Sequence, residues 1–452
     1  MDRISLTKEY LAEVTASGAR AGELVGSQPE SKLLNGLYQG RYLSRPLFLG
    51  HDEQVRLAAD LENLRTALVS LPDRLFGGDL AAFARAVGMT DVQVSAILRG
   101  RGPSVTRQAR ADMYADAGGI RLLEFNMGST LGGMDNADMC RALLEHPVLA
   151  RFAERRGLTY VDTMREQVNN MFVETGFEPG SRPFVALTDW PSSFESLAPY
   201  MEQFCERWQA LGLDAHPCHI GQLTVRDGRV WLGDRPIDVI SRMFLIEDLL
   251  ESDEAPALMD PILDAAQRGE VKIFTPMDSE LFASKGALAM LSDESNRGRF
   301  TGEELASLDR ILPWTRMVRA GEVTLEDGSR VGLVEYALAH QEDLALKPTL
   351  LHGGHGVLLG WQPDVTAELW RDRLTEALDG PYVIQRRVVQ QPELFPDEDG
   401  NLREWLVAWG VFTVVNGYGG AFARGTTVES GVGIVNVANG AHAGAVLHRS
   451  AR

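Results

Sequence analysis

Two polar side chains follow an apolar run in segment 122–133, which reads L-L-E-F-N-M-G-S-T-L-G-G. Glu124 and Asn126 lie two residues apart, just before a loop of small residues. Because side chains alternate between the two faces of a strand, both would project from the same face. A carboxylate and a carboxamide that converge beside a glycine-rich loop supply the hard oxygen ligands that Mg²⁺ prefers. We therefore expect Glu124 and Asn126 to hold Mg²⁺ against the phosphates of a nucleotide.

A lysine and a glycine loop later in the chain have the chemistry of a phosphate site. Lys347 ends an apolar, strand-like segment, and residues 352–357 read H-G-G-H-G-V. One point charge, together with the backbone N–H groups of Gly353, Gly354 and Gly356, would hold phosphate oxygens. The loop lacks the Gly-Lys-Ser/Thr of a Walker A motif, and strand-like residues follow it where a dinucleotide fingerprint has a helix.

Segment 382–388, Y-V-I-Q-R-R-V, is an apolar strand interrupted by polar residues. Such a strand can form a hinge between two lobes, with backbone groups on its edge and apolar side chains on its faces to bind adenine. Gln385 and Val388 are the candidate contacts to the nucleotide. The alternative is an ordinary edge strand with a basic outer face, and the segment alone does not decide between the two.

The composition is that of a globular protein without a nucleic-acid or membrane footprint. Of the 452 residues, 44% are hydrophobic and 24% are charged, and this length suggests roughly two to four domains. The formal net charge of −19 disfavours nucleic acids and anionic membranes as partners, since both need a positive surface. The cysteines lack metal-ligand spacing, and neither a secretory signal nor an apolar run of about 18 residues is visible. We expect a cytoplasmic protein.

The elements that must position these residues mix helices and strands. Residues 1–118 have the pattern of a mainly helical region. Strand-like segments at 120–125, 183–187, 214–218 and 237–240, with a helix at 194–211, give a βαβ pattern that favours a parallel sheet. A second α/β unit spans residues 343–390, and strand-like residues dominate 405–437. The sequence therefore predicts an α+β chain with α/β elements.

In this order, the motifs resemble the ATP-grasp superfamily in its circularly permuted form, as in eukaryotic-type glutathione synthetases and their bacterial relatives. The resemblance covers about residues 105–445. In that family a substrate-binding arginine shortly precedes the E-x-N strand, as Arg110 does here, and a small-residue turn like the one around Ser129 follows it. The loop of Lys347 and the strand 382–388 are similar to the family's second nucleotide lysine and its hinge.

The remaining family motifs also have counterparts in this chain. The strand that ends in Arg242 resembles the family's strand that carries a second substrate-binding arginine. The segment Ser-Lys-Gly around Lys285 resembles the family's segment that contains the first nucleotide-binding lysine. Near the C-terminus, Arg424 and the alanine- and glycine-rich segment 437–444, which contains Asn439, are similar to the strand and loop that close over the substrate.

The resemblance implies an activity and a division of the chain. The activity is that of an ATP-dependent carboxylate–amine ligase with Mg²⁺, which forms an amide bond through an acyl phosphate. The substrates would be a small carboxylate and an amine (amino acid, peptide or polyamine), and a homodimer is implied. The four parts would be a helical N-terminal region (1–118), a substrate-binding α/β domain with the metal strand (119–342), an ATP-grasp lid (343–402) and C-terminal strands with the substrate loop (403–452).

Roles for individual residues follow from the same resemblance. Lys285 and Lys347 would hold the α- and β-phosphates, while the amides of residues 353–356 would hold the β- and γ-phosphates. The catalytic candidates are Arg242 and Arg424, which would grip the substrate carboxylate or the acyl phosphate. The candidates for substrate binding are Arg110, Ser129 and Asn439.

The chain departs from the family at three places. His352 stands where the family has a metal-binding glutamate, and imidazole is a poor ligand for Mg²⁺. A second metal would then be missing, be held by another carboxylate, or be of a different kind. Gln385 and Arg386 replace an acidic hinge residue, and Thr426 replaces a lysine. We therefore do not expect glutathione synthesis itself.

Two other readings of the chain remain open. Residues 80–101 have the spacing of a helix-turn-helix, with Gly88 in the turn and Thr90 as a helix cap, which would indicate DNA binding. The overall negative charge and the lack of a neighbouring dimerisation segment speak against it. The other reading is a nucleotide-binding ATP-grasp protein without ligase activity, which His352 and Thr426 make credible.

Overall fold

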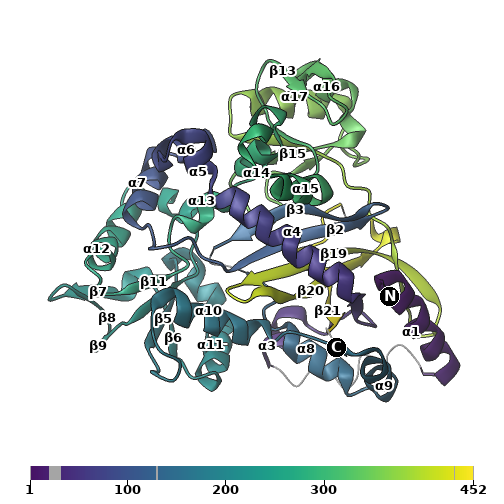
Figure 1. The fold of residues 1–452 in the computed structure, drawn as a ribbon. Helices are drawn as coiled ribbons and strands as arrows, with labels where there is room; N and C mark the ends of the chain where they lie inside the picture. Colours follow the sequence, from purple (N-terminus) through teal and green to yellow (C-terminus); the bar gives the residue numbers. More distant parts are fainter. Residues whose placement is uncertain (1, 20–31, 129–130, 432, 451–452) are drawn as a thin grey trace.

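The computed structural model describes residues 2–19, 32–128, 131–431 and 433–450. Its largest sheet joins strands from residues 47–159 to strands from residues 393–449 (Figure 1). Along this sheet the order is β1 (Leu47–Leu49), β21 (His442–Arg449), β20 (Gly417–Thr427), β19 (Leu402–Val414), β2 (Ala109–Asp116) and β3 (Gly119–Met127), with β18 (Glu393–Pro396) on β19 and β4 (Leu158–Thr159) on β21. Only β1 pairs with its neighbour in parallel among these described strands. We call it the main sheet.

Helices cover both faces of the main sheet. Side chains alternate along its strands, so apolar residues on each face can pack against a helix. Trp409 and Val411 of β19 belong to the same buried cluster as the apolar face of α4 (His51–Val69). Phe412 of the same strand packs instead with Met164 and Val168 of α10 (Thr163–Thr175). A third cluster lies around β1 and β21 and is closed by α1 (Arg3–Ser17), α3 (Lys32–Tyr38), α8 (Asn136–Leu144) and α9 (Pro147–Arg156).

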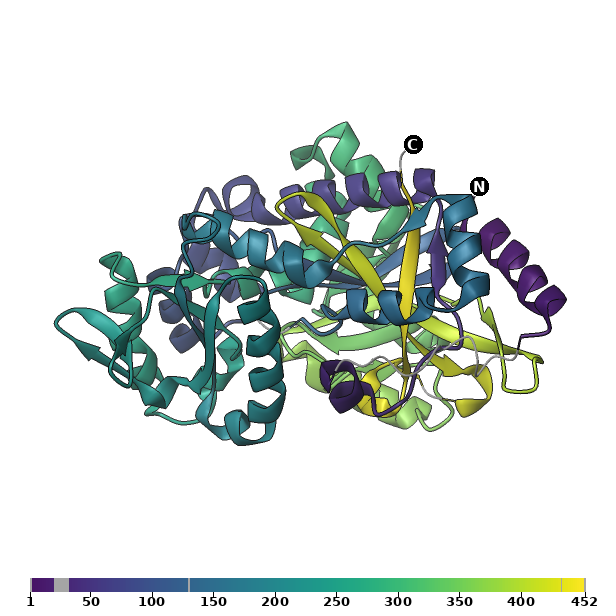
Figure 2. The same ribbon diagram turned by 90° about the horizontal axis from the view of Figure 1, so that it is seen from below.

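A smaller parallel sheet lies at one end of the molecule (Figure 2). Its strands are β11 (Lys272–Phe274), β10 (Val239–Arg242), β5 (Phe184–Asp189) and β6 (Asp214–His219). Helix α11 (Pro191–Ala210) connects β5 to β6, so the βαβ pattern expected from the sequence is confirmed. An Asp-Gly turn joins β7 (Leu223–Arg226) and β8 (Arg229–Leu232) in a hairpin, to which β9 (Arg235–Pro236) is added. Helix α12 (Ala255–Gln267) packs beside them.

A third sheet forms a small unit with its own core around Trp314 and Trp370. The strand order is β12 (Thr315–Met317), β17 (Tyr382–Arg386), β15 (Leu344–Pro348) and β16 (Leu358–Leu359), all antiparallel. We call this unit the lid sheet; α16 (Leu333–Ala339), α17 (Ala367–Leu378) and the hairpin β13 (Glu322–Thr324)–β14 (Arg330–Gly332) belong to it.

Shorter helices connect these sheets. They are α5 (Leu71–Phe76), α6 (Leu80–Ala86), α7 (Asp91–Arg99), α13 (Ser279–Ala283), α14 (Lys285–Ser292) and α15 (Gly302–Ile311), with 3₁₀ turns η1 (Ile220–Gln222), η2 (Ile246–Leu250), η3 (Glu294–Arg299), η4 (Gln341–Asp343), η5 (Val428–Ser430) and η6 (Val437–Asn439). The region 1–118 is mainly helical as expected, but it also contributes β1 and β2 to the main sheet. The four-part division of the chain stays a prediction. Within the described ranges, no helix combines the length and the apolar character needed to cross a bilayer.

Candidate functional site

A cavity of about 910 Å³ lies where the main sheet, the parallel sheet and the lid sheet meet. Most residues predicted from the sequence to form a site line this cavity, although they come from distant parts of the chain. They are Arg110, Glu124, Asn126, Lys285, Lys347, Gly353, Gly354, Gln385, Val388 and Arg424. Among the predicted residues, Ser129 lies outside the described residues.

The paired strands β2 and β3 bring two carboxylates and an amide together. Asp112 lies opposite Glu124 and Arg110 lies opposite Asn126, so all four side chains share one face of the sheet. The Nδ2 atom of Asn126 donates to Glu124 Oε1 at 3.3 Å and to Asp112 Oδ2 at 3.4 Å. The same-face arrangement of Glu124 and Asn126 that strand periodicity predicts is therefore present, with Asp112 as a third member.

Asp112 pairs with two arginines at the wall of the cavity. Arg110 donates to both of its oxygens, from Nε at 2.6 Å and from Nη2 at 2.8 Å, and Arg424 Nη2 lies 3.1 Å from Oδ2. Gly410 of the intervening β19 makes room, because a Cβ there would lie 3.1 Å from Cδ of Arg110. The two predicted arginines are thus adjacent and oriented by one carboxylate.

Two lysines approach this group from other elements. Lys285 begins α14, where its Nζ lies 3.3 Å from Glu124 Oε2 and donates to the carbonyl oxygen of Leu351 at 2.8 Å. Lys347 on β15 donates to Oε1 of Gln385 on the neighbouring β17 at 2.5 Å. Both predicted nucleotide lysines therefore point into the same cavity.

These opposite charges shift the protonation equilibria of the site. Burial alone would raise the pKa of Glu124, but Lys285 and Lys347 hold it well below its usual range, so the carboxylate is ionised. Burial lowers the pKa of Lys347 to about 8, although the nearby Glu124 acts in the opposite direction. The site therefore joins a firmly negative oxygen ligand to a lysine that titrates near neutral pH.

The glycine loop after β15 forms one edge of the cavity. Gly353, Gly354 and Gly356 have φ angles of 65°, 84° and 70°, which favour glycine because it lacks a Cβ. Asn436 donates to the carbonyl oxygen of Gly353 at 3.3 Å, so the C-terminal loop contacts the glycine loop. Gly356 itself is not among the residues that line the cavity.

Arg242, Asn439 and Gln385 are engaged with other residues of the protein. Arg242 is only 1% exposed and does not line the cavity, because its guanidinium pairs with Glu280 and donates to backbone carbonyls, including that of Thr275 at 2.8 Å. Asn439 donates to Ile434 O at 3.3 Å, and Asn436 lines the cavity in its place. The side chain of Gln385 contacts Lys347, which makes it a positioning residue for the lysine.

Sequence reasoning missed three acidic residues at or beside the cavity. Asp112 is not predicted as a site residue, because its strand lies in the region 1–118, for which the sequence predicts mainly helices. Glu280 and Glu247 lie near His352, and one ligand atom from each of the three residues lies within 4.8 Å of the other two. Burial and the neighbouring Glu280 raise the pKa of Glu247.

The end of the cavity away from the lysines is largely apolar. Helix α11 and the segment before α8 supply most of this wall, and a few amide and acidic side chains interrupt it. The apolar residues are Leu37, Leu131, Met134, Leu187, Leu197, Tyr200, Phe204, Trp208 and Phe422, and the polar ones are Gln167, Asp189, Ser193 and Gln203. The cavity thus combines a charged end with an end suited to apolar groups.

The fold was compared with proteins of known structure. A glutathione synthetase-like effector from Globodera pallida, in its apo form, superposes with a TM-score of 0.58 at 11% sequence identity, over 99% of this chain and 97% of that chain. The chain has a glutathione synthetase-like fold. The ATP-grasp type of fold predicted from the sequence is therefore confirmed.

Other comparisons add less. A candidate gamma-glutamylcysteine synthetase from Methylobacillus flagellatus KT has a TM-score of 0.41 at 12% identity, over 82% of this chain and 86% of that chain. No protein-family model matches the chain.

In this fold, the segment with helix-turn-helix spacing packs against another helix. Helices α6 and α7 form as expected, and Thr90 caps α7 together with Gln93. However, Arg99 pairs with Asp260 and Asp264 of α12. Helix α7 is thus packed against an acidic neighbour, which speaks against its use as a DNA-recognition helix.

Proposed function

We propose that this chain is an ATP-dependent carboxylate–amine ligase. The observation that carries the proposal is the convergence of Glu124, Asn126, Lys285 and Lys347 beside the glycine loop, in one cavity of a glutathione synthetase-like fold. These residues come from three separate regions of the chain, and together they match the charge pattern of a bound nucleoside triphosphate and its metal ion.

The two lysines and the glycine loop would bind the phosphates of ATP. Lys285 and Lys347 supply point charges for the α- and β-phosphates, and the amides of residues 353–356 would bind the outer phosphates. On the hinge strand, the N–H groups of Arg386 and Arg387 already donate to Trp314 O and Asp343 O. Because these two N–H groups are already hydrogen-bonded, Val388 is the residue of the hinge that would bind adenine.

Glu124 and Asn126 fit Mg²⁺, because they present hard oxygen ligands side by side and the carboxylate is ionised. When bound, Mg²⁺ would neutralise part of the charge on the phosphates. Lys285, which lies 3.3 Å from Glu124, would hold the same phosphates from the other side.

The reaction would proceed in two steps. A carboxylate oxygen of the acid attacks the γ-phosphorus of ATP, and ADP leaves. The neutral amine nitrogen then attacks the carbonyl carbon of the acyl phosphate, phosphate leaves, and the proton lost from the nitrogen passes to the phosphate. Acid, amine and ATP thus give an amide, ADP and phosphate. Arg424 and Arg110, held side by side by Asp112, would bind the carboxylate and the acyl phosphate, because an arginine fork matches their geometry.

The apolar end of the cavity points to the class of substrate. Tyr200, Phe204 and Trp208 of α11 would contact an apolar or aromatic group, while Gln203 and Ser193 would hold polar atoms beside it. We propose that one substrate is an amino acid, peptide or amine with a bulky apolar group. The size of the cavity allows ATP and a small substrate together.

A second candidate is a nucleotide-binding protein without ligase activity. The observation that favours it is the engagement of Arg110 and Arg424 with Asp112, since arginines already neutralised by a carboxylate bind a substrate carboxylate less strongly.

Release of ADP and phosphate separates the two candidates. Purified protein with ATP and Mg²⁺ is incubated with a pool of carboxylic acids, a pool of amines, or both, with apolar and polar members assayed separately. A ligase releases ADP and phosphate at a substantial rate only when both pools are present, and mass spectrometry then identifies the amide. ATP binding without release under any combination would overturn the proposal.

A further inference from the structure

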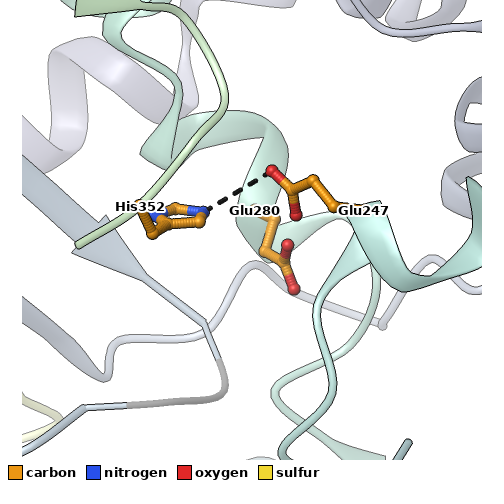
Figure 3. Close-up of side chains that lie close together, drawn as sticks. All are labelled: Glu247, Glu280 and His352. Atoms are coloured by element: carbon orange, nitrogen blue, oxygen red, sulfur yellow. Dashed lines mark ion pairs between the residues drawn. The ribbon is translucent and has the colours of Figure 1, made fainter. Parts of the chain in front are cut away.

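Three side chains beside the cavity form a group with the composition of a transition-metal site. Glu247 comes from η2, Glu280 from α13 and His352 from the loop after β15. Figure 3 shows them side by side, and one ligand atom of each lies within 4.8 Å of the other two. Ligands of one metal ion lie about 3 to 4 Å apart, given bonds near 2.1 Å, so small side-chain rotations would bring the three onto one ion.

The side chain of Glu247 is left without a hydrogen-bond partner among the described residues. Both of its carboxylate oxygens are buried, and neither has a hydrogen-bond partner among the described residues. The Nε2 atom of His352 lies 3.9 Å from Oε1 of Glu247, which is too long for a hydrogen bond. A buried carboxylate without a partner is costly unless a cation compensates it.

The contacts of Glu280 fix its position in the group. Glu280 pairs with Arg242 and accepts the backbone N–H of Ile246 at 2.9 Å, so it is held firmly in place. These contacts orient the carboxylate in the way that outer-shell partners orient metal ligands. Glu247 lies beside an imidazole without a hydrogen-bond partner among the described residues.

We propose that Glu247, Glu280 and His352 bind a divalent first-row transition ion of the Mn²⁺ to Zn²⁺ series, separate from the Glu124–Asn126 site. The imidazole is what selects the ion, because it suits Fe²⁺, Ni²⁺, Cu²⁺ and Zn²⁺, and Mn²⁺ accepts it beside carboxylate ligands, whereas Mg²⁺ and Ca²⁺ prefer oxygen ligands. The remaining coordination positions would be filled by water or by a ligand in the cavity, which Glu280 and His352 both line.

The site would tie the glycine loop to the rest of the cavity wall. His352 directly precedes Gly353, and the carbonyl of Leu351 on its other side accepts a hydrogen bond from Lys285. A metal ion would link this loop to η2 and α13, and so hold the loop amides in place before a nucleotide arrives.

The test uses Mn²⁺ alone, without nucleotide, on the full-length protein. Binding is measured by the loss of the free Mn²⁺ signal in electron paramagnetic resonance, and electron spin echo modulation reports whether a ¹⁴N nucleus of imidazole is bound. We expect the wild-type protein to bind Mn²⁺ with ¹⁴N modulation. His352→Ala should lose the modulation and weaken binding at least about tenfold, the loss that removal of even an outer-shell partner causes.

Three further variants make the test specific. His355→Ala changes an exposed histidine of the same loop and should keep both affinity and modulation. Glu247→Gln preserves size, replaces a carboxylate ligand by a neutral amide and should weaken Mn²⁺ binding without unfolding the protein, as checked by circular dichroism. Glu124→Gln should keep the ¹⁴N modulation. The absence of wild-type binding, ¹⁴N modulation that survives in His352→Ala, or unchanged affinity in Glu247→Gln would each overturn the proposal.

Discussion

The ammonium group of Lys347 lies 2.5 Å from the amide oxygen of Gln385, across the paired strands β15 and β17. The amide nitrogen of Gln385 donates in turn to the hydroxyl of Thr315 on β12 at 3.2 Å. Three strands of the lid sheet therefore hold one lysine in a fixed position at the cavity. Because a neutral amide holds it, and not a carboxylate, the charge of Lys347 remains for a phosphate.

Lys347→Met should weaken the binding of an ATP analogue about 10- to 100-fold, because hydrogen bonds to a charged group contribute about 1.5–3 kcal/mol. Methionine keeps the apolar stem and removes only the charge. Isothermal titration with a non-hydrolysable analogue and Mg²⁺ measures the change. Lys272→Met, at an exposed position of β11, is the matched control and should bind like the wild type. An unchanged affinity for Lys347→Met would show that Lys347 does not contact phosphate.

Asp112→Asn should destabilise the protein, since it leaves two arginines together without their shared carboxylate. The side chains of Asp112, Arg110 and Arg424 are only 7%, 11% and 10% exposed, and loss of one partner from a buried pair costs about 3–5 kcal/mol. The free energy of unfolding in urea measures this loss. Asp116→Asn, on the same strand, breaks the more exposed pair with Arg121 and should cost at most about 1 kcal/mol. Equal losses in the two variants would contradict the role given to Asp112.

The contrast between Glu124 and Asp112 shows how far the sequence reaches into this site. Strand periodicity is local, so the shared face of Glu124 and Asn126 follows from their spacing alone. Asp112 reaches them through the pairing of β2 with β3, in which it lies opposite Glu124. The expectation of a helical region over residues 1–118 leaves no place for this strand, so the sequence pattern does not indicate Asp112.

The surroundings of Arg242, a predicted substrate contact, also could not be predicted from the sequence. The motif placed it correctly at the end of β10, but its burial against Glu280 depends on how α13 packs on the parallel sheet. The main fold prediction succeeded because several motifs in order constrain a topology. The partner of each buried charge is set by tertiary packing and could not be predicted from the sequence.

The buried carboxyl of Asp135 should make stability depend on pH. Burial raises its pKa to about 7, and the hydroxyl of Tyr38, 3.2 Å away, only partly offsets this. An ordinary aspartate in the unfolded chain has a pKa of 3.8. Between these values the folded protein holds a proton that the unfolded chain has lost, so stability falls as pH rises from about 4 to about 7.

Asp135→Asn removes this dependence, because the amide cannot ionise. Asn is also accepted at the N-cap of α8, where Asp135 stands. Relative to the wild type, the variant should gain on the order of 2 kcal/mol between pH 5 and pH 8, measured by urea unfolding at both values. The pH 5 measurement serves as the internal control. A difference between variant and wild type that stays the same at both pH values would rule out a titrating Asp135.

Gly88 in the turn between α6 and α7 should be essential for the contact with the lid sheet. Its φ angle is +100°, and a Cβ there would lie 2.2 Å from Cβ of Pro381, just before β17. Gly88→Ala should therefore destabilise the protein by at least about 2 kcal/mol, because the left-handed backbone and the clash both oppose the methyl group. Since β17 carries Gln385, the displaced lid should also bind the ATP analogue more weakly.

Gly78→Ala separates the clash from the backbone strain. Gly78 has a similar φ of +87°, but the nearest atom to an added Cβ, Asp73 Oδ1, lies 3.5 Å away. This variant should lose only about 1 kcal/mol of stability and keep its affinity for the analogue. If Gly88→Ala behaves like Gly78→Ala in both measurements, the α6–α7 pair does not position the lid. If it loses affinity as well as stability, the segment with helix-turn-helix spacing serves the nucleotide site by fixing β17.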